Sequence, residues 1–369
     1  MNIDDIALTL EHNIGPKTAA GLLEVFGSAG AVYSASPAEL ERRGGLRERL
    51  AVQISRKEFH KQAEKELKYA TKHGLTAIAS TDPEYPAMMH EMNDYPHVIY
   101  VRGNIGALGM RNVSMVGTRR ISGYGQVMCD KLVRQLAERV PDLCIVSGLA
   151  FGVDVHCHRA AIRYGVPTVA VVANALPGVT PAQHADIARD IVERGGAIIS
   201  ECHSNSKQTG DFYVARNRII AGMSEGTVIV EADLESGSLH TAQFALDYNR
   251  QLMAVPGRAT DEVACGTNNL IKTNRAQMVC YGEDIIRALM WDVYVPDVGE
   301  KPVKAAAHVS PDAQGLLGCF ESGNAVSADR LSEVTALGHT GLAPLLLELE
   351  FAGMIRKLPG GMYEKIGNY

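Results

Sequence analysis

The pattern of hydrophobic and polar positions divides the chain into regions. Residues 2 to about 70 carry apolar side chains at helical spacing, interrupted by Gly, Ser and Pro, which predicts short amphipathic helices. Between residues 113 and 281, short apolar runs alternate with helical patterns. Residues 295–309 have no clear period and are expected to be a linker. Residues 310–369 predict three short helices and a β-hairpin, which is a winged-helix pattern.

The central region predicts seven buried strands. They are expected at 113–117, 144–148, 168–174, 197–201, 226–232, 251–257 and 277–281, with helices at 124–139, 154–164, 183–194, 214–223 and 238–249. Continuously apolar strands that alternate with helices are typical of a parallel, doubly wound sheet covered on both faces. The predicted fold class is therefore α/β, with an extended Rossmann-like and mostly parallel sheet. The apolar, β-branched stretch 97–103 is expected as an edge strand.

The predicted division is a helical domain at 1–72, the Rossmann-like domain at 73–294, the linker at 295–309 and the winged helix at 310–369. A length of 369 residues fits two or three domains.

Three loops at the carboxyl ends of the strands are suited to an anion. Each has glycine and then a helix N-terminus, where unpaired N–H groups and the helix dipole favour negative charge. The candidate residues are Gly117, Thr118, Arg119, Arg120, Ser122, Tyr124, Gly125, Ser147, Gly148, Ser236, Gly237, Ser238 and Thr241. Any one loop could be only a tight turn. Ligands bind at this edge of such sheets, so the convergence of three predicts a site for several phosphates.

A fourth stretch combines aromatic and basic side chains. Phe212 and Tyr213 precede Arg216, Asn217 and Arg218, a pairing of stacking and charge that single-stranded nucleic acid favours. Side chains two positions apart on a helix diverge. One of the two arginines could therefore reach a ligand while the other pairs with structural carboxylates.

Two segments outside the centre have open alternatives. The Gly-Pro hairpin at 12–18 could offer N–H groups to a DNA phosphate, or it could be scaffold or a protein contact. The last predicted helix, 341–353, carries Glu348 and Glu350 and no Arg or Lys. Such a helix favours a protein-contact module over a reader of the DNA major groove.

Composition narrows the class of protein. A net charge of −6 argues against a basic surface that binds nucleic acid indiscriminately, although a local basic cleft remains possible. The seven cysteines are scattered without a CxxC pair, so we expect a reducing compartment and a cytoplasmic location. Residues 1–16 lack the cationic start and apolar core of a signal peptide, and no uncharged apolar run could span a bilayer. We expect no membrane partner.

Enzyme signatures are weak. The sequence has no GxxxxGK[ST] loop, and no GxGxxG opens the first glycine loop. His156, Cys157 and His158 are neighbours on a predicted helix and point in different directions, so they could not share one tetrahedral ion. No catalytic residue, metal or cofactor is predicted.

The loops together resemble six blocks of the DprA (DNA-processing protein A, or Smf) family, in order and at similar spacing, over about residues 80 to 290. The blocks read VGTRRISGYG, SGLAFGVDVHCHRAA, GGAIISE, RNRIIAGMSEGTVIVEADLESGSLHTAQFAL, AVPG and CGTNNLIK. By motif match, Arg119 is the arginine of the family's G-[ST]-R loop, and Arg216 and Arg218 are those of its FPxRNR stretch. Tyr213 and Val214 stand where the family usually has Phe-Pro. Tyrosine keeps a stacking face, so DNA binding is still expected there.

The resemblance implies a helical SAM-like domain in front of the Rossmann-like domain and a winged helix behind it. It also implies a homodimer without catalytic activity that binds single-stranded DNA in natural transformation, protects it and loads the RecA recombinase. The alternative is a nucleotide-processing enzyme that resembles Rossmann-like nucleoside-monophosphate phosphoribohydrolases. That enzyme would need a carboxylate such as Glu231 or Glu201 aimed at the sugar, in a closed acidic pocket. The DNA-binding hypothesis requires an open basic cleft.

Overall fold

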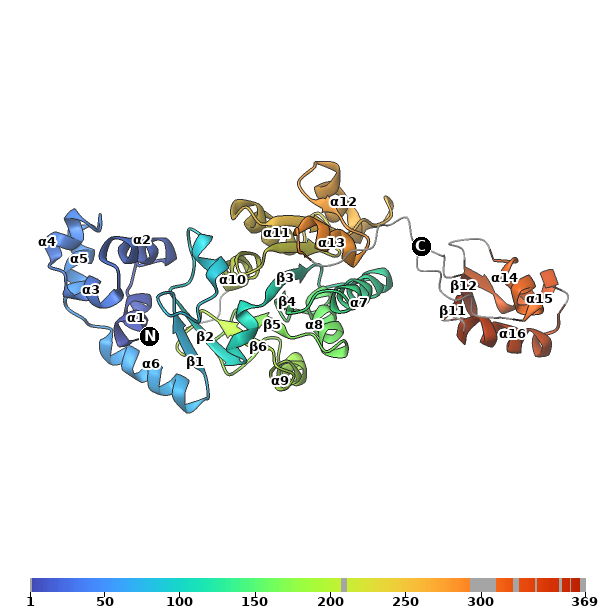
Figure 1. Cartoon of the computed structure of the whole chain (residues 1–369), viewed down its shortest axis with the longest axis horizontal. Coiled ribbons are helices and arrows are strands. Elements are labelled where there is room, and N and C mark those ends of the chain that lie inside the picture. The colour runs from blue at the N-terminus through green and yellow to red at the C-terminus, as the bar shows by residue number, and fades with distance from the viewer. Residues whose placement is uncertain are drawn as a thin grey trace. The chain divides into compact units, whose positions relative to one another are not determined.

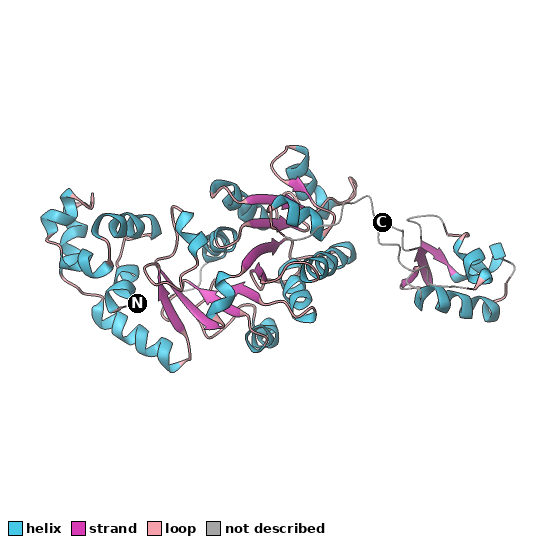
Figure 2. Cartoon of the chain, in the orientation of Figure 1, coloured by secondary structure: helices cyan, strands magenta, loops and turns pink. Residues whose placement is uncertain are grey.

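The computed structural model describes residues 2–206, 211–292, 310–320, 325–335, 337–351, 354–358 and 360–365. The chain forms two compact units, Met1–Val295 and Pro296–Tyr369 (Figure 1). Figure 2 shows that the first unit begins with helices alone and then mixes helices with strands. The predicted linker lies outside the described residues. The division of the first unit at residue 72 stays a prediction.

Six helices open the first unit. They are α1 (Ile3–Leu10), α2 (Pro16–Phe26), α3 (Ala29–Ser34), α4 (Pro37–Arg42), α5 (Glu48–Ser55) and α6 (His60–Lys72). Local sequence fixes their ends: Asn2 and Asp5 form a reciprocal capping box, and so do Ser36 and Glu39. The hairpin at 12–18 leads into α2, whose N-cap Gly15 makes no side-chain hydrogen bond.

The large sheet has nine strands in the order β1-β2-β6-β5-β4-β3-β7-β8-β9. They are β1 (Thr76–Ala79), β2 (Val98–Gly103), β3 (Arg111–Val116), β4 (Leu143–Ser147), β5 (Thr168–Val171), β6 (Ala197–Ser200), β7 (Gly226–Ile229), β8 (Gln251–Ala254) and β9 (Gln277–Met278). All neighbours from β6 to β9 are parallel, whereas the β1–β2 and β2–β6 pairs are antiparallel. The predicted Rossmann-like, mostly parallel sheet is confirmed.

The prediction that 97–103 is an edge strand is wrong. β2 pairs with β1 on one side and with β6 on the other, so β1 is the outer strand. Residues 98–101 are all buried, as the strand is covered on both faces. That continuous apolar run is the signal of an internal strand.

Helices cover both faces of the sheet (Figures 1 and 2). They are α7 (Gly123–Ala137), α8 (Val153–Arg163), α9 (Ala185–Glu193), α10 (Asp211–Gly222), α11 (Ser238–Asp247), α12 (Cys265–Lys272) and α13 (Gly282–Ala288), with 3-10 turns η1 (Ala87–Glu91), η2 (Ile105–Gly109), η3 (Ala182–His184) and η4 (Glu262–Ala264). Met115 and Ile145 join α7, α8 and α13 in one core, whereas Val146 and Ile229 join α10 and α11 in another. Alternating strand residues thus feed two cores.

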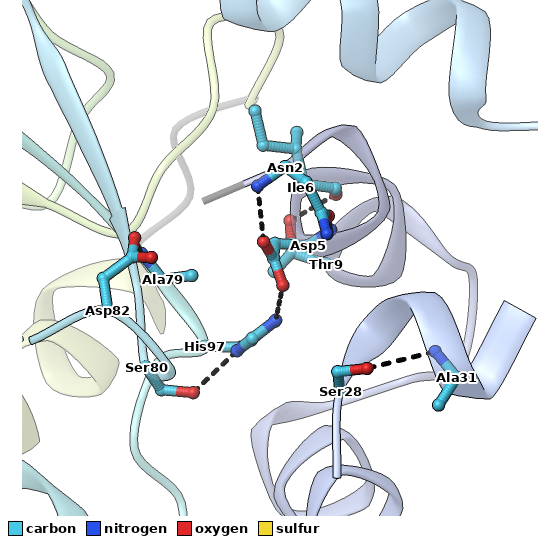
Figure 3. Close-up of polar contacts among 10 residues, drawn as sticks. All are labelled: Asn2, Asp5, Ile6, Thr9, Ser28, Ala31, Ala79, Ser80, Asp82 and His97. Atoms are coloured by element: carbon cyan, nitrogen blue, oxygen red, sulfur yellow. Dashed lines mark hydrogen bonds and ion pairs between the residues drawn. The ribbon is translucent and has the colours of Figure 1, made fainter. Parts of the chain in front are cut away.

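A buried polar contact joins the helical segment to the sheet (Figure 3). His97, just before β2, contacts Asp5 of α1 through Nε2 at 3.2 Å and Ser80 through Nδ1 at 2.8 Å. Although burial opposes it, hydrogen bonds from His97 and the Asn2 backbone hold the pKa of Asp5 below its ordinary value. The contact fixes α1 against the antiparallel end of the sheet.

The second unit contains α14 (Pro311–Leu317), β10 (Ala325–Ser327), α15 (Ala328–Thr335), α16 (His339–Phe351), β11 (Ile355–Leu358) and β12 (Met362–Lys365). Its strands form an antiparallel sheet in the order β10-β12-β11. Leu316, Leu331 and Leu349 meet in its core. Three helices with a small antiparallel sheet confirm the predicted winged helix. The sequence did not predict β10, because three residues carry too little pattern.

Candidate nucleic-acid interface

The strand order reverses beside β3. Its neighbours are β4 on one side and β7 on the other, so the chain leaves this strand in opposite directions. In open α/β sheets such a reversal leaves a crevice outside the carboxyl ends of the strands. A cleft of about 1070 Å³ lies there, lined by the loops after β3, β7 and β8 and by one side of α10.

The loop after β3 presents two exposed arginines. Its backbone is fixed, because the Thr118 N–H donates to the carbonyl oxygen of Glu231 at 2.7 Å. Gly117 is required here: a Cβ would lie 2.6 Å from that same oxygen. Arg119 and Arg120 line the cleft, and no described carboxylate forms an ion pair with either. The Arg119 guanidinium lies over the Tyr213 ring, 5.7 Å from its centroid.

The start of α7 is not the open anion site that the sequence predicts. Ser122 caps the helix, and its N–H donates to the Glu231 carboxylate at 2.9 Å while its hydroxyl donates to the other oxygen. Glu231 also lies against Gly125, where a Cβ would collide with it. Tyr124 donates its hydroxyl to the carbonyl oxygen of Pro256 at 2.8 Å. The protein's own carboxylate therefore occupies this N-terminus, and these residues support the loop without lining the cleft.

The second glycine loop is also mainly structural. Ser147 is fully buried and donates its hydroxyl to the carbonyl oxygen of Met115 at 2.7 Å. The Gly148 carbonyl accepts a hydrogen bond from Arg216 at 2.6 Å. Neither lines the cleft, whereas Ala150 of the same loop does.

Helix α10 separates its two arginines. Arg218 donates to Glu201 at 2.6 Å and lies 3.8 Å from Asp94, away from the cleft. Arg216 reaches the cleft but is only 6% exposed, and its Nη1 donates to the carbonyl oxygens of Gly148 and Val171. Burial lowers the pKa of Arg216, and the nearby Asp154 carboxylate partly opposes this lowering.

The remaining α10 candidates divide similarly. Tyr213 and Asn217 line the cleft, and the Asn217 amide approaches the Gly237 carbonyl at 3.4 Å. Phe212 is half-buried and is not among the lining residues.

The loop before α11 supplies the remaining predicted residues that line the cleft. Ser236, Gly237, Ser238 and Thr241 all line the cleft, and the hydroxyls of Ser236 and Ser238 lie 2.9 Å apart. The cleft thus gathers eleven of the predicted residues: Gly117, Thr118, Arg119, Arg120, Tyr213, Arg216, Asn217, Ser236, Gly237, Ser238 and Thr241.

Several lining residues were missed. The lining residues without a predicted role in binding include Asp154, Asp233, Leu234, Glu235, Glu262, Val263 and Cys265. The available signal was that the loop after β8 opens at the same sheet edge, although the residues of this loop that line the cleft include neither arginine nor serine. The cleft is therefore mixed in charge and not the basic cleft that the DNA-binding hypothesis expects: its lining combines arginines of the β3 loop and α10 with carboxylates largely from the loops after β7 and β8. Burial raises the pKa of one of these carboxylates, Asp154, although Arg216 nearby opposes the rise.

The carboxylates required by the enzyme alternative have internal partners. Glu231 holds Ser122, and Glu201 holds Arg218. Among the described residues no three His, Cys, Asp or Glu side chains are grouped to hold a metal ion. His158 instead contacts the Thr168 hydroxyl at 2.7 Å. Within the same described ranges, no helix is both long and apolar enough to cross a membrane.

Fold and cleft together define a Rossmann-like protein with an arginine-bearing site at the strand reversal and a separate winged-helix unit. Family models agree: the one described as DNA recombination-mediator protein A matches residues 76–290, and the DprA winged helix domain matches residues 300–361. The chain belongs to the DNA recombination-mediator protein A (DprA) family, which confirms the resemblance seen in the sequence.

Individual relatives show the extent of the similarity. Protein Smf of Escherichia coli (strain K12) is 34% identical over 284 residues, which cover 75% of this chain and 74% of Smf. The X-ray structure of DprA from Streptococcus pneumoniae matches with a TM-score of 0.67 and 26% identity, over 78% of this chain and 98% of that one. DNA processing protein A from Helicobacter pylori, solved to study its single-stranded DNA binding mode, matches with a TM-score of 0.53 and 27% identity, over 60% and 97%.

Proposed function

We propose that this recombination mediator binds single-stranded DNA in the cleft at the strand reversal. The observation that carries the proposal is the exposed pair Arg119 and Arg120, which form no ion pair with a described carboxylate, together with the Tyr213 ring over which the Arg119 guanidinium lies. Guanidinium groups bind phosphate oxygens in pairs, and an aromatic ring stacks on bases of any identity. The H. pylori relative, whose single-stranded DNA binding mode has been studied, supports the same ligand class.

The eleven lining residues are the proposed contact surface. Ser122, Tyr124, Gly125, Ser147, Gly148 and Arg218 are proposed to act indirectly, by holding the loops and α10 in place. Phe212 stays a prediction. The internal partners of Glu231 and Glu201 support DNA binding over nucleotide hydrolysis, since neither residue lines the cleft.

The test is a titration of the protein with a fluorescent single-stranded oligonucleotide and with a duplex of the same length, at one salt concentration. Tighter binding of the single strand, with similar affinity for different base sequences, is expected because the cleft reads phosphates and stacks bases. Equal affinity for the duplex would contradict the proposal. Hydrolysis of nucleoside monophosphates by the purified protein would favour the enzyme alternative.

The biological role is proposed from the family. We infer that the protein is a cytoplasmic homodimer that protects incoming single strands during natural transformation and loads RecA onto them. Its seven free cysteines are compatible with a reducing compartment. Light scattering tests the dimer. Nuclease resistance of bound oligonucleotides tests protection, and RecA filament formation on a coated single strand, with and without the protein, tests loading.

The winged-helix unit is proposed to contact protein. The described part of its longest helix, α16, carries Glu348 and Glu350 and no Arg or Lys. Removing residues 311–369 is therefore expected to leave single-strand affinity within a few-fold, in the same titration. A loss as large as that from removing the Arg119 side chain would reassign this unit to DNA binding.

A further inference from the structure

Phe151 is a large aromatic side chain that remains 47% exposed on the loop after β4. It lies between Ala150, which lines the cleft, and Gly152, which precedes α8. Because the Phe151 ring is so exposed, it does not serve as a hydrophobic core residue. Phe151 is also not among the DNA contacts proposed above. Exposed aromatics beside arginines are the pattern by which proteins hold single-stranded nucleic acid.

The backbone places Phe151 next to the arginine loop. Gly152 has a φ of +79°, and a Cβ there would collide with the backbone of Thr118 and Arg119. The next N–H, of Val153, donates to the Thr118 carbonyl at 3.1 Å. The two loops therefore lie directly against each other, and Phe151 is anchored beside the arginine loop.

The ring is also held from beneath. It makes a T-shaped contact with His184, with ring centroids 4.7 Å apart. His184 is only 4% exposed, and its Nδ1 donates to the carbonyl of the fully buried Leu149 at 2.7 Å. A ring fixed in this way loses little conformational freedom when a ligand stacks on it.

We propose that Phe151 is a second base platform, on which a base of the bound strand stacks just outside the cleft. Arg119 links the two platforms: its guanidinium lies over Tyr213, and its backbone packs against Gly152. The strand would thus leave the cleft across the loop after β4. This inference rests on the proposed function and adds a subsite to it.

The experiment measures binding of fluorescent oligothymidylate to the full chain. Phe151→Ala is expected to weaken binding about five-fold or more, as loss of one stacked base does. The dependence of affinity on salt should stay unchanged, because no phosphate contact is lost. Phe151→Leu keeps apolar bulk against His184 and should not restore affinity, whereas Phe151→Trp should. Val127→Ala is the matched control, since Val127 is 50% exposed on α7 and does not line the cleft.

Fluorescence gives a second readout. The native Trp291 is 8% exposed and donates its ring N–H to Glu225 at 2.7 Å, so its emission should change little on binding. In Phe151→Trp, added oligothymidylate should quench the new tryptophan, as base stacking does.

Two results would overturn the inference. The first is that Phe151→Ala binds the oligonucleotide as tightly as the wild type does, whereas Arg119→Ala binds it more weakly. The proposed function would then stand, and the Phe151 subsite would not. The other is full recovery by Phe151→Leu, which would show that bulk and not a stacking face matters. A wild-type protein that binds no oligothymidylate would overturn the proposed function itself, and this subsite with it.

Discussion

Arg119 and Arg120 differ from Arg216 and Arg218 in burial and in partners, although all four lie in arginine-bearing motifs of the same domain. The first pair is exposed in a loop and has no described ionic partner. The second pair is 6% and 5% exposed and is bound to carbonyl and carboxylate oxygens of the protein. An exposed arginine can exchange water for phosphate at little cost to the fold. A buried one already satisfies internal acceptors, and its removal leaves those acceptors unpaired.

The largest expected effect is on the buried pair. Arg218→Ala leaves Glu201 without its partner at 2.6 Å in a mostly buried site. Breaking such a pair typically costs about 3–5 kcal/mol. We expect a loss of this order in the free energy of unfolding, measured in urea, with little change in single-strand affinity of the folded fraction. Arg49→Ala, at an exposed arginine of α5, is the control. An Arg218→Ala protein of normal stability but poor DNA binding would reverse the comparison.

The next largest effect concerns another buried group of this domain, the imidazole of His158, and whether the folded protein accepts a positive charge there. Burial, with His184 and Arg216 nearby, lowers the pKa of His158 to about 3. Below the ordinary histidine pKa of about 6.5, the unfolded chain binds a proton that the folded protein excludes, so stability falls as the pH drops from about 6.5 towards 3. By pH 5 this single group should remove about 2 kcal/mol.

His158→Gln removes that titration. The difference in free energy of unfolding between pH 7 and pH 5 should therefore be smaller in the variant than in the wild type, by roughly the same 2 kcal/mol. His240→Gln, at an exposed position, controls for loss of a histidine. If His158→Gln and the wild type show the same pH dependence, the buried histidine is not held neutral.

The exposed pair should show the opposite balance. Arg119→Ala should weaken single-strand binding about ten-fold or more, since a charge-assisted hydrogen bond contributes about 1.5–3 kcal/mol. The slope of log affinity against log salt should become shallower by about 0.7, the value of one lost phosphate contact. Arg119→Lys should restore part of the affinity, because charge remains but the fork geometry is lost. The free energy of unfolding of Arg119→Ala should be nearly that of the wild type. If the folded variant has the affinity and the salt slope of the wild type, the DNA does not bind in this cleft.

The sequence predicted the sheet and the edge at which the cleft lies, because buried parallel strands are continuously apolar and their carboxyl ends meet. It could not rank the candidate residues. The Glu231 carboxylate that fills the start of α7 is 109 positions from Ser122 along the chain, so no local pattern shows the pairing. Spacing indicated that Arg216 and Arg218 diverge, but only packing decides which of them meets a carboxylate. The loop after β8 was missed as a wall because its lining residues carry none of the usual phosphate-binding side chains.

The smallest expected effect concerns the wall that faces the arginines. Glu235 is exposed, lines the cleft and has no described ion-pair partner, so it should repel the phosphates of a bound strand. Interactions between exposed charges are weak and screened by salt, typically about 0.2–1 kcal/mol. Glu235→Gln should therefore strengthen oligothymidylate binding only about two-fold at low salt, and the gain should vanish at high salt. Glu193→Gln, outside the cleft on α9, controls for net charge alone. Equal gains from both variants would mean that the strand senses the overall charge of the protein, and weaker binding by Glu235→Gln would mean that the carboxylate holds the strand instead of repelling it.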